Sequence, residues 1–244
     1  MIEADRLTKR YGSLAAADEV SFAVKPGEVV GLLGPNGAGK TTVLRMLAGI
    51  LTPSGGAARI CGVDPVVDPF EAKRRLGFLS GGTALYKRFT PREVLRFFGR
   101  LHDLPEATIA RRTGELVELL QMADFADRRC DGLSSGQLQK ANLARAFLHD
   151  PPSLILDEPT ASLDIVTGSF LLSTIRAARA AGKAVLFSTH IMSEAEYLCD
   201  RVVLIHKGRV VDQGPVADIC ARRGVGNLTD AFLSHVGETV RVAP

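Results

Sequence analysis

A glycine-rich loop between two apolar segments constrains the fold of this chain more than any other feature. The loop reads GPNGAGKTT over residues 34–42 and follows the apolar run VVGLL, which is typical of a strand buried on both faces. After the loop, apolar residues recur at helical spacing as far as Pro53, at Val43, Leu44, Leu47 and Leu51. The order strand, glycine loop, helix is the setting in which such a loop binds phosphate.

The loop meets the pattern GxxxxGK[ST] with Gly34, Gly39, Lys40 and Thr41. Freed backbone amides and the positive end of the following helix form a nest for phosphate oxygens, while Lys40 neutralises the β and γ phosphates and Thr41 ligates Mg²⁺. A glycine-rich turn with a solvated lysine is the alternative, and the dinucleotide pattern GxGxxG is not met. We therefore predict that a nucleoside polyphosphate is bound by Gly34, Pro35, Asn36, Gly37, Ala38, Gly39, Lys40, Thr41 and Thr42.

The rest of the pattern predicts a helical block inserted in an α/β domain. A capping signal at Thr90 opens a run of helical periodicity that Pro151 and Pro152 stop. The strands SLILDE and AVLFST follow, and a hairpin turns at Lys207 and Gly208. We expect mostly parallel central strands in one domain over residues 1–224, with an α/β core (1–83 and 153–224) and a helical subdomain (84–152). The polar stretch 225–244 is a C-terminal tail without an assigned structure.

Two carboxylates and a histidine follow buried strands, at the edge where open α/β sheets bind ligands. Asp157 fits the metal-holding aspartate of phosphate-loop enzymes, and Glu158 fits a base that polarises the attacking water. Solvated carboxylates at a strand end are the alternative. His190, just beyond AVLFST, is predicted to face the γ-phosphate. Lys40, Glu158 and His190 are thus the candidate catalytic residues, and Thr41 and Asp157 the candidate metal ligands.

Composition excludes several other classes. The net charge of +3 is too small to indicate nucleic acid, and no apolar run is long enough for a membrane span. The N-terminus lacks the apolar centre of a signal peptide, so a cytoplasmic location is expected. The four cysteines are far apart without a CxxC pair, which predicts buried free thiols.

The stretch LSSGQLQKANLARAFLHDPPSLILDEPTASLD, residues 133–164, resembles the ATP-binding subunits of ABC transporters. Six features occur in the family's order within residues 2–220: Tyr11, the phosphate loop, the loop from Ser134 to Gln137, Asp157 with Glu158, the motif ASLD, and His190. The resemblance implies a P-loop NTPase (RecA-like) core with an N-terminal antiparallel β subdomain and an inserted helical subdomain.

The resemblance also implies roles for residues that the pattern alone does not explain. Tyr11 is expected to stack on adenine. Ser134, Ser135, Gly136 and Gln137 are expected to close over the γ-phosphate of ATP bound by a second copy, with Asp164 in the contact. Two copies then meet head to tail with ATP and Mg²⁺ between them, and Glu158 is the base for hydrolysis.

The stretches 76–93 and 188–211 are similar to the sodium-efflux and related ABC-2-type exporter ATPases of bacteria. This implies an ATPase that drives export through a separately encoded membrane subunit, on the inner face of the membrane. Soluble ABC-type ATPases that act on ribosomes or on damaged DNA share these motifs and are one alternative. A regulatory protein that binds ATP without hydrolysing it is another.

Two positions depart from the family pattern. Ser135 stands where LSGGQ has a glycine, a small change if that position avoids positive φ. Gly81 stands where a glutamine is usual, which puts the link between metal, water and membrane partner in doubt.

Overall fold

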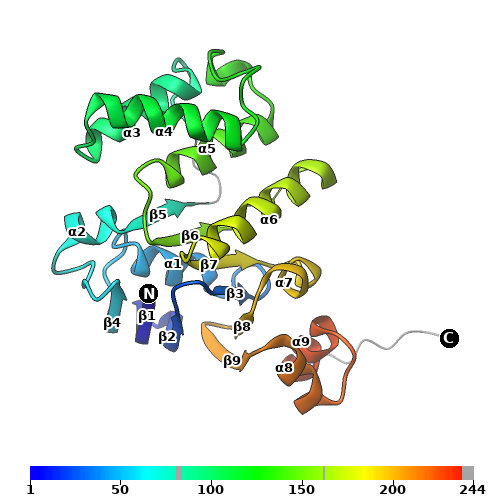
Figure 1. Cartoon of the computed structure of the whole chain (residues 1–244). Helices are drawn as coiled ribbons and strands as arrows, with labels where there is room; N and C mark the ends of the chain where they lie inside the picture. Colours follow the sequence, from blue (N-terminus) through cyan, green and yellow to red (C-terminus); the bar gives the residue numbers. More distant parts are fainter. Residues whose placement is uncertain (81–83, 162, 238–244) are drawn as a thin grey trace.

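The computed structural model describes residues 1–80, 84–161 and 163–237. Figure 1 shows the helices α3, α4 and α5 gathered at one end of the molecule and the strands β1, β2 and β4 toward the other, with a larger sheet between them. Gly81, where a glutamine was expected, lies outside the described residues.

The small sheet is antiparallel, with the strand order β2-β1-β4. Its strands are β1 (Ile2–Tyr11), β2 (Leu14–Val24) and β4 (Gly55–Ile60). Tyr11 pairs with Leu14 across the turn that joins β1 to β2. The predicted N-terminal antiparallel β subdomain is confirmed.

The large sheet has the order β5-β6-β7-β3-β8-β9, and only β9 runs antiparallel to its neighbour. Its strands are β3 (Val29–Leu33), β5 (Leu76–Leu79), β6 (Ser153–Asp157), β7 (Ala184–Thr189), β8 (Arg201–His206) and β9 (Arg209–Gly214). Every residue of β3, β6 and β7 is buried, as continuous apolar runs predict for central parallel strands. Because parallel strands end at the same edge, the segments that follow these three strands meet there.

Helix α1 (Lys40–Leu47) packs between the two sheets, in a core that includes Leu7, Leu32 and Leu44. The helix ends before Leu51, although the apolar spacing continues to that residue. Gly49 turns the chain with a φ of 65°, and a Cβ there would lie 2.9 Å from the carbonyl oxygen of Pro65. Gly55 and Gly56, which follow shortly after Pro53, begin β4.

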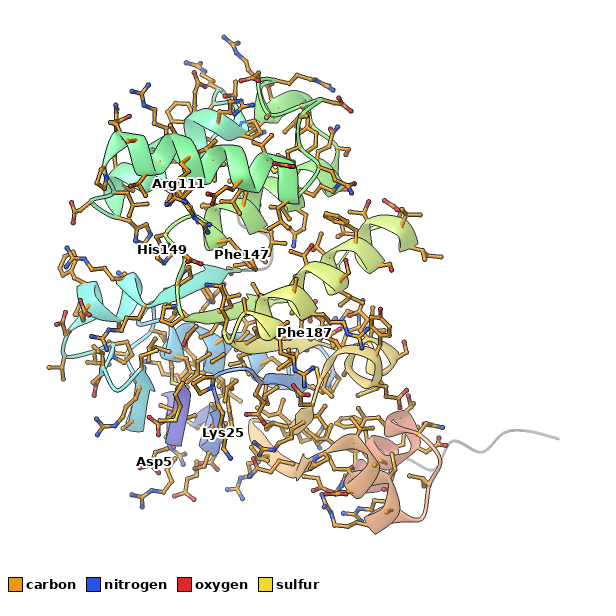
Figure 2. All side chains as sticks on the ribbon, viewed as in Figure 1. Asp5, Lys25, Arg111, Phe147, His149 and Phe187 are labelled. Atoms are coloured by element: carbon orange, nitrogen blue, oxygen red, sulfur yellow. The ribbon has the colours of Figure 1, made fainter. Side chains whose placement is uncertain are left out.

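The helical block consists of α3 (Pro91–Leu101), α4 (Glu106–Leu119) and α5 (Ser135–Phe147), with a 3₁₀ turn over Cys130–Gly132. The predicted cap at Thr90 is present, since Thr90 and Glu93 form a reciprocal capping box. Phe147, labelled in Figure 2, belongs to the apolar core that joins this block to the large sheet. Helix α2 (Pro69–Arg74) precedes β5.

Two stacked imidazoles lie where the helical block meets the edge of the large sheet. The rings of His102 and His149 are parallel within 8°, with centroids 3.8 Å apart. A ring nitrogen of His149 lies 3.2 Å from the carbonyl oxygen of Leu76. Burial, followed by the charge of the neighbouring His102, lowers the pKa of His149 to about 4, so the ring is neutral near pH 7.

Four helices follow β6 along the chain: α6 (Ile165–Ala180), α7 (Met192–Leu198), α8 (Val216–Arg223) and α9 (Leu228–Val236). Helix α9 lies in the stretch to which the sequence assigned no structure. Leu228 and Phe232 of α9 are buried against Leu33 and Val202 of the large sheet. The stretch looks unpatterned because this helix has only nine residues, and its apolar contacts come from distant strands.

The four cysteines are free thiols, but only Cys130 is buried. Cys61, Cys199 and Cys220 are half-buried, so the prediction that all four are buried is wrong for these three. Cys61 and Cys199 directly follow an element, where packing is less complete than inside one.

Candidate functional site

The glycine-rich loop joins β3 to α1 at the carboxyl edge of the large sheet. A Cβ on Gly34 would lie 2.2 Å from the carbonyl oxygen of Ile205, and one on Gly39 would lie 2.3 Å from that of Ala16. Gly39 also has a φ of 104°, which favours glycine. The glycines therefore let the loop pass close to β8 and β2. No side chain caps α1, so its first amides are available to an anion.

Lys40 is almost fully buried, with 4% of its surface exposed. Its Nζ donates to the carbonyl oxygens of Gly34 at 2.7 Å and Pro35 at 3.2 Å. The same Nζ lies 3.3 Å from Oε1 of Glu158. The loop thus folds around a buried ammonium group, which carries a carboxylate as its partner.

Asp157 ends β6 with both carboxylate oxygens engaged. Thr41 Oγ1 donates to Oδ2 at 3.0 Å, and Ser188 Oγ donates to Oδ1 at 2.6 Å. The structure therefore brings the two predicted metal ligands together. A hydroxyl and a carboxylate are the hard oxygen donors that suit Mg²⁺, whose remaining positions are usually filled by water and nucleotide phosphates. The residues fit the ion.

Glu158 stands between Lys40 and His190. Its Oε1 lies 3.3 Å from Lys40 Nζ and 3.4 Å from His190 Nδ1. The backbone of Glu158 has a φ of 46°, which is unusual for a residue other than glycine. Its amide donates to the carbonyl oxygen of Ser188 at 3.1 Å and to the hydroxyl of Ser188 at 3.0 Å. Strand β7 therefore holds the backbone turn that presents this carboxylate.

His190 directly follows β7, with 43% of its side chain exposed. The hydroxyl of Thr189 accepts from the amide of Ile191 at 3.0 Å and donates to Glu194 at 2.8 Å. Glu194 is the third residue of α7 and reaches the start of its own helix through this hydroxyl. The residues on both sides of His190 are thus fixed, while the imidazole itself faces solvent.

A cavity of about 370 Å³ opens over the phosphate loop. Its walls combine the loop with the start of β2 and the turn between β8 and β9. The sequence did not predict the contribution of Leu14, Ala15, Ala16, Lys207 and Gly208 to these walls. Small residues beside a hairpin turn have no recognisable motif, although β2 passes so close to the loop at Ala16 that only glycine fits at position 39.

Tyr11 is not among the residues that line this cavity. It lies at the end of β1, opposite Leu14, with 52% of its surface exposed. Lys9 Nζ is 5.5 Å from the centre of its ring. The ring therefore belongs to the rim near β2, outside the cavity formed by the described residues.

The loop from Ser134 to Gln137, called the signature loop below, does not line the phosphate-loop cavity either. Ser134 and Gln137 form a capping box at the start of α5, with distances of 3.3 Å and 3.0 Å. Ser135 is the first residue of this helix and has no positive φ, so the departure from glycine is tolerated as expected. A Cβ on Gly136 would lie 3.3 Å from Thr167 of α6, so the starts of α5 and α6 are neighbours.

Asp164 caps α6 by accepting from the amide of Thr167 at 2.9 Å and from its hydroxyl at 2.8 Å. These two bonds, the backbone bond first, lower the pKa of Asp164. Asp164 lines a second hollow of about 790 Å³, which also includes Glu158 and His190. Glu158 thus lies on the wall of both hollows.

Comparison with known proteins identifies the family in which this fold occurs. The family described as "ABC transporter" matches residues 17–161, more than half of the chain. The chain belongs to the ABC transporter family. The ABC transporter ATP-binding protein NatA of Bacillus subtilis is 43% identical over 222 residues, covering 91% of this chain and 90% of the relative. The linearmycin resistance ATP-binding protein LnrL of the same organism is 32% identical, covering 100% of this chain and 78% of the relative.

Solved structures agree with this ABC assignment. The ATP-binding subunit of an ABC transporter superposes with a TM-score of 0.90 at 32% identity, covering 97% of this chain and 99% of the other. A dimeric bacterial ABC transporter cassette superposes with a TM-score of 0.78 at 27% identity, covering 88% and 98%.

The family membership and the fold together confirm the central predictions. The chain has the P-loop NTPase fold and is the ATP-binding, ATP-hydrolysing subunit of an ABC transporter. It uses ATP with Mg²⁺ and works with a membrane-spanning subunit, as this family does. No helix in the described part of the chain is long and apolar enough to span a membrane.

Proposed function

We propose that this subunit binds ATP over the phosphate loop and hydrolyses it in a head-to-tail dimer, where each copy completes the site of the other. The loop residues and Lys40 bind the phosphates, and Tyr11 stacks on adenine. Thr41 and Asp157 hold Mg²⁺, which neutralises charge on the phosphates. Glu158 is the general base, and His190 faces the γ-phosphate.

The observation that carries this proposal is the position of the Glu158 carboxylate. Its Oε1 lies within 3.4 Å of both Lys40 and His190, and the side chain reaches both hollows. A γ-phosphate on the loop competes with Glu158 for the ammonium of Lys40. The carboxylate is then free to accept a proton from water as that water attacks the γ-phosphorus. The bond to the bridging oxygen breaks, and ADP and phosphate leave.

The second copy supplies the signature loop, which does not line the cavity of its own chain. Ser134, Ser135, Gly136 and Gln137 form the exposed start of a helix, a suitable partner for an anion on another chain. Next to Asp164, Ile165 and Val166 are 90% and 79% exposed, which favours an apolar contact between copies. The dimeric state of the bacterial cassette with this fold supports the arrangement.

The direction of transport is proposed from the names of the relatives. Their names include linearmycin resistance and Nod factor export, which supports an exporter. We place the subunit on the inner face of the cell membrane, where cytoplasmic ATP is available. The exported substrate is sodium or another compound, selected by the membrane subunit. The division into a core, a helical subdomain over 84–152 and a tail from 225 is part of the same proposal.

Replacing Glu158 by Gln tests the shared site. The amide keeps the shape of the side chain but does not accept the proton, so hydrolysis falls by about 100-fold or more, in the range of general-base catalysis. Binding persists, and a dimer accumulates with ATP and Mg²⁺ in sedimentation. The double variant Glu158→Gln with Lys40→Ala is the matched control and stays monomeric. A single variant that sediments as a monomer with ATP contradicts the shared site.

A further inference from the structure

Ser188 is the first polar residue of the central strand β7, after four apolar residues. It is the fifth residue of β7, is 0% exposed, and follows Val185, Leu186 and Phe187 in the core. In the parallel register it lies beside Asp157 of β6 and Leu32 of β3. Burying a hydroxyl costs free energy unless the group is hydrogen-bonded, and an apolar side chain would satisfy packing alone. The hydrogen bonds of the hydroxyl therefore indicate why a serine occupies this position.

The hydroxyl of Ser188 uses its donor and its acceptor on two neighbouring residues. It donates to Asp157 Oδ1 at 2.6 Å, within the short range of bonds to a charged oxygen. It accepts from the amide of Glu158 at 3.0 Å. Since Thr41 engages the other oxygen of Asp157 at 3.0 Å, the plane of that carboxylate is fixed from two sides.

The second bond stabilises an unfavourable backbone turn. A positive φ at a residue with a side chain is unfavourable and persists only where the surroundings enforce it. Glu158 has a φ of 46°, and its amide is held by both the carbonyl oxygen and the hydroxyl of Ser188. This turn directs the carboxylate of Glu158 toward Lys40 and His190.

We infer that Ser188 is a positioning residue for hydrolysis, which orients the metal-holding carboxylate of Asp157 and the turn that presents Glu158. The inference rests on the proposed roles of these two residues. Partners that orient a metal ligand typically contribute 10- to 100-fold to metal affinity or activity. Ser188 touches neither nucleotide nor metal in this assignment, because its buried hydroxyl donates to Asp157 and accepts from Glu158.

The test replaces Ser188 by Ala and by Thr and measures Mn²⁺ binding to the ADP-loaded protein by electron paramagnetic resonance. Ser188→Ala is expected to weaken Mn²⁺ binding by about 10- to 100-fold. The affinity for ADP in EDTA stays the same, because the loop and Lys40 are untouched. Ser188→Thr keeps the hydroxyl and restores Mn²⁺ binding. A role in packing alone would not produce this pattern.

Ser153→Ala is the matched control. Ser153 is also fully buried, but it lies at the opposite end of the same sheet, next to Cys61. Its removal is expected to leave Mn²⁺ affinity unchanged. Should Ser188→Ala fold poorly by circular dichroism, Ser188→Cys replaces it with the same criteria, because a thiol keeps the volume and donates weakly.

Asp157→Asn separates failure of this inference from failure of the proposed function. If Asp157→Asn weakens Mn²⁺ binding and Ser188→Ala does not, the role of Ser188 is overturned and the metal site stands. If neither variant changes Mn²⁺ binding, both are overturned.

Discussion

The phosphate-loop cavity and the signature loop use their polar side chains in opposite ways. At the cavity, residues from distant parts of the chain bond to one another: Lys40 pairs with Glu158, and Thr41 donates to Asp157. At the signature loop, Ser134 and Gln137 bond to each other, at the exposed start of one helix. The groups of the first site meet within one chain, because they lie at one edge of the large sheet. The second is an exposed surface that we propose contacts ATP bound by another copy of the chain, and the predictions below test this contrast.

The largest effect is expected at Lys40. Lys40→Ala leaves the Glu158 carboxylate without the ammonium group beside it. It also removes the positive charge that is proposed to bind the phosphates of ATP. Removing the cation that pairs with a bound phosphate costs about 2 to 5 kcal/mol of binding free energy, so ATP binding falls by about 30-fold to several thousand-fold. Calorimetric titration with ATP measures the loss. Unchanged ATP affinity would contradict the assignment of the loop to phosphate.

A smaller effect is expected at Tyr11, on the rim of the cavity. Tyr11→Ala is expected to weaken ATP binding by about 1 to 3 kcal/mol, the range for a base stacked on an aromatic ring. The reference ligand is inorganic triphosphate, which has no base. Titrations of both ligands distinguish stacking from an indirect effect, since an equal loss for triphosphate means that the rim was disturbed instead.

The smallest effect on a single chain is expected at Ser134. Ser134→Ala removes a helix cap, which costs about 1 kcal/mol of unfolding free energy, and leaves ATP binding by the monomer unchanged. In the Glu158→Gln background, however, it reduces the ATP-dependent dimer. Urea unfolding and sedimentation give the two readouts.

Thr90→Ala is the matched control for Ser134→Ala. Thr90 forms the same capping box with Glu93 at the start of α3, so its loss costs similar stability. It has no expected role between copies, and the dimer should persist. If both variants weaken the dimer equally, the signature loop acts through stability alone, and the contrast between the two sites fails.

Local sequence pattern was sufficient for the elements whose signal lies within a few residues. Neighbouring residues predicted the strand before the phosphate loop, the capping box at Thr90 and the hairpin at Lys207. The family resemblance added the antiparallel subdomain and the use of ATP. Helix α9 was missed because Leu228 and Phe232 are recognisable as apolar contacts only once β3 and β8 lie beneath them.

The sequence by itself was enough to predict the chemistry of this protein, because a lysine, a threonine, two carboxylates and a histidine at these spacings favour a triphosphate and a metal ion. Only the tertiary structure decided how these groups engage one another: the shared oxygen of Glu158, the walls contributed by β2, and the bonds from Ser188. The physical reason is that parallel strands far apart in the chain end at one sheet edge. Their hydrogen-bond register, which no local pattern contains, sets which side chains meet there.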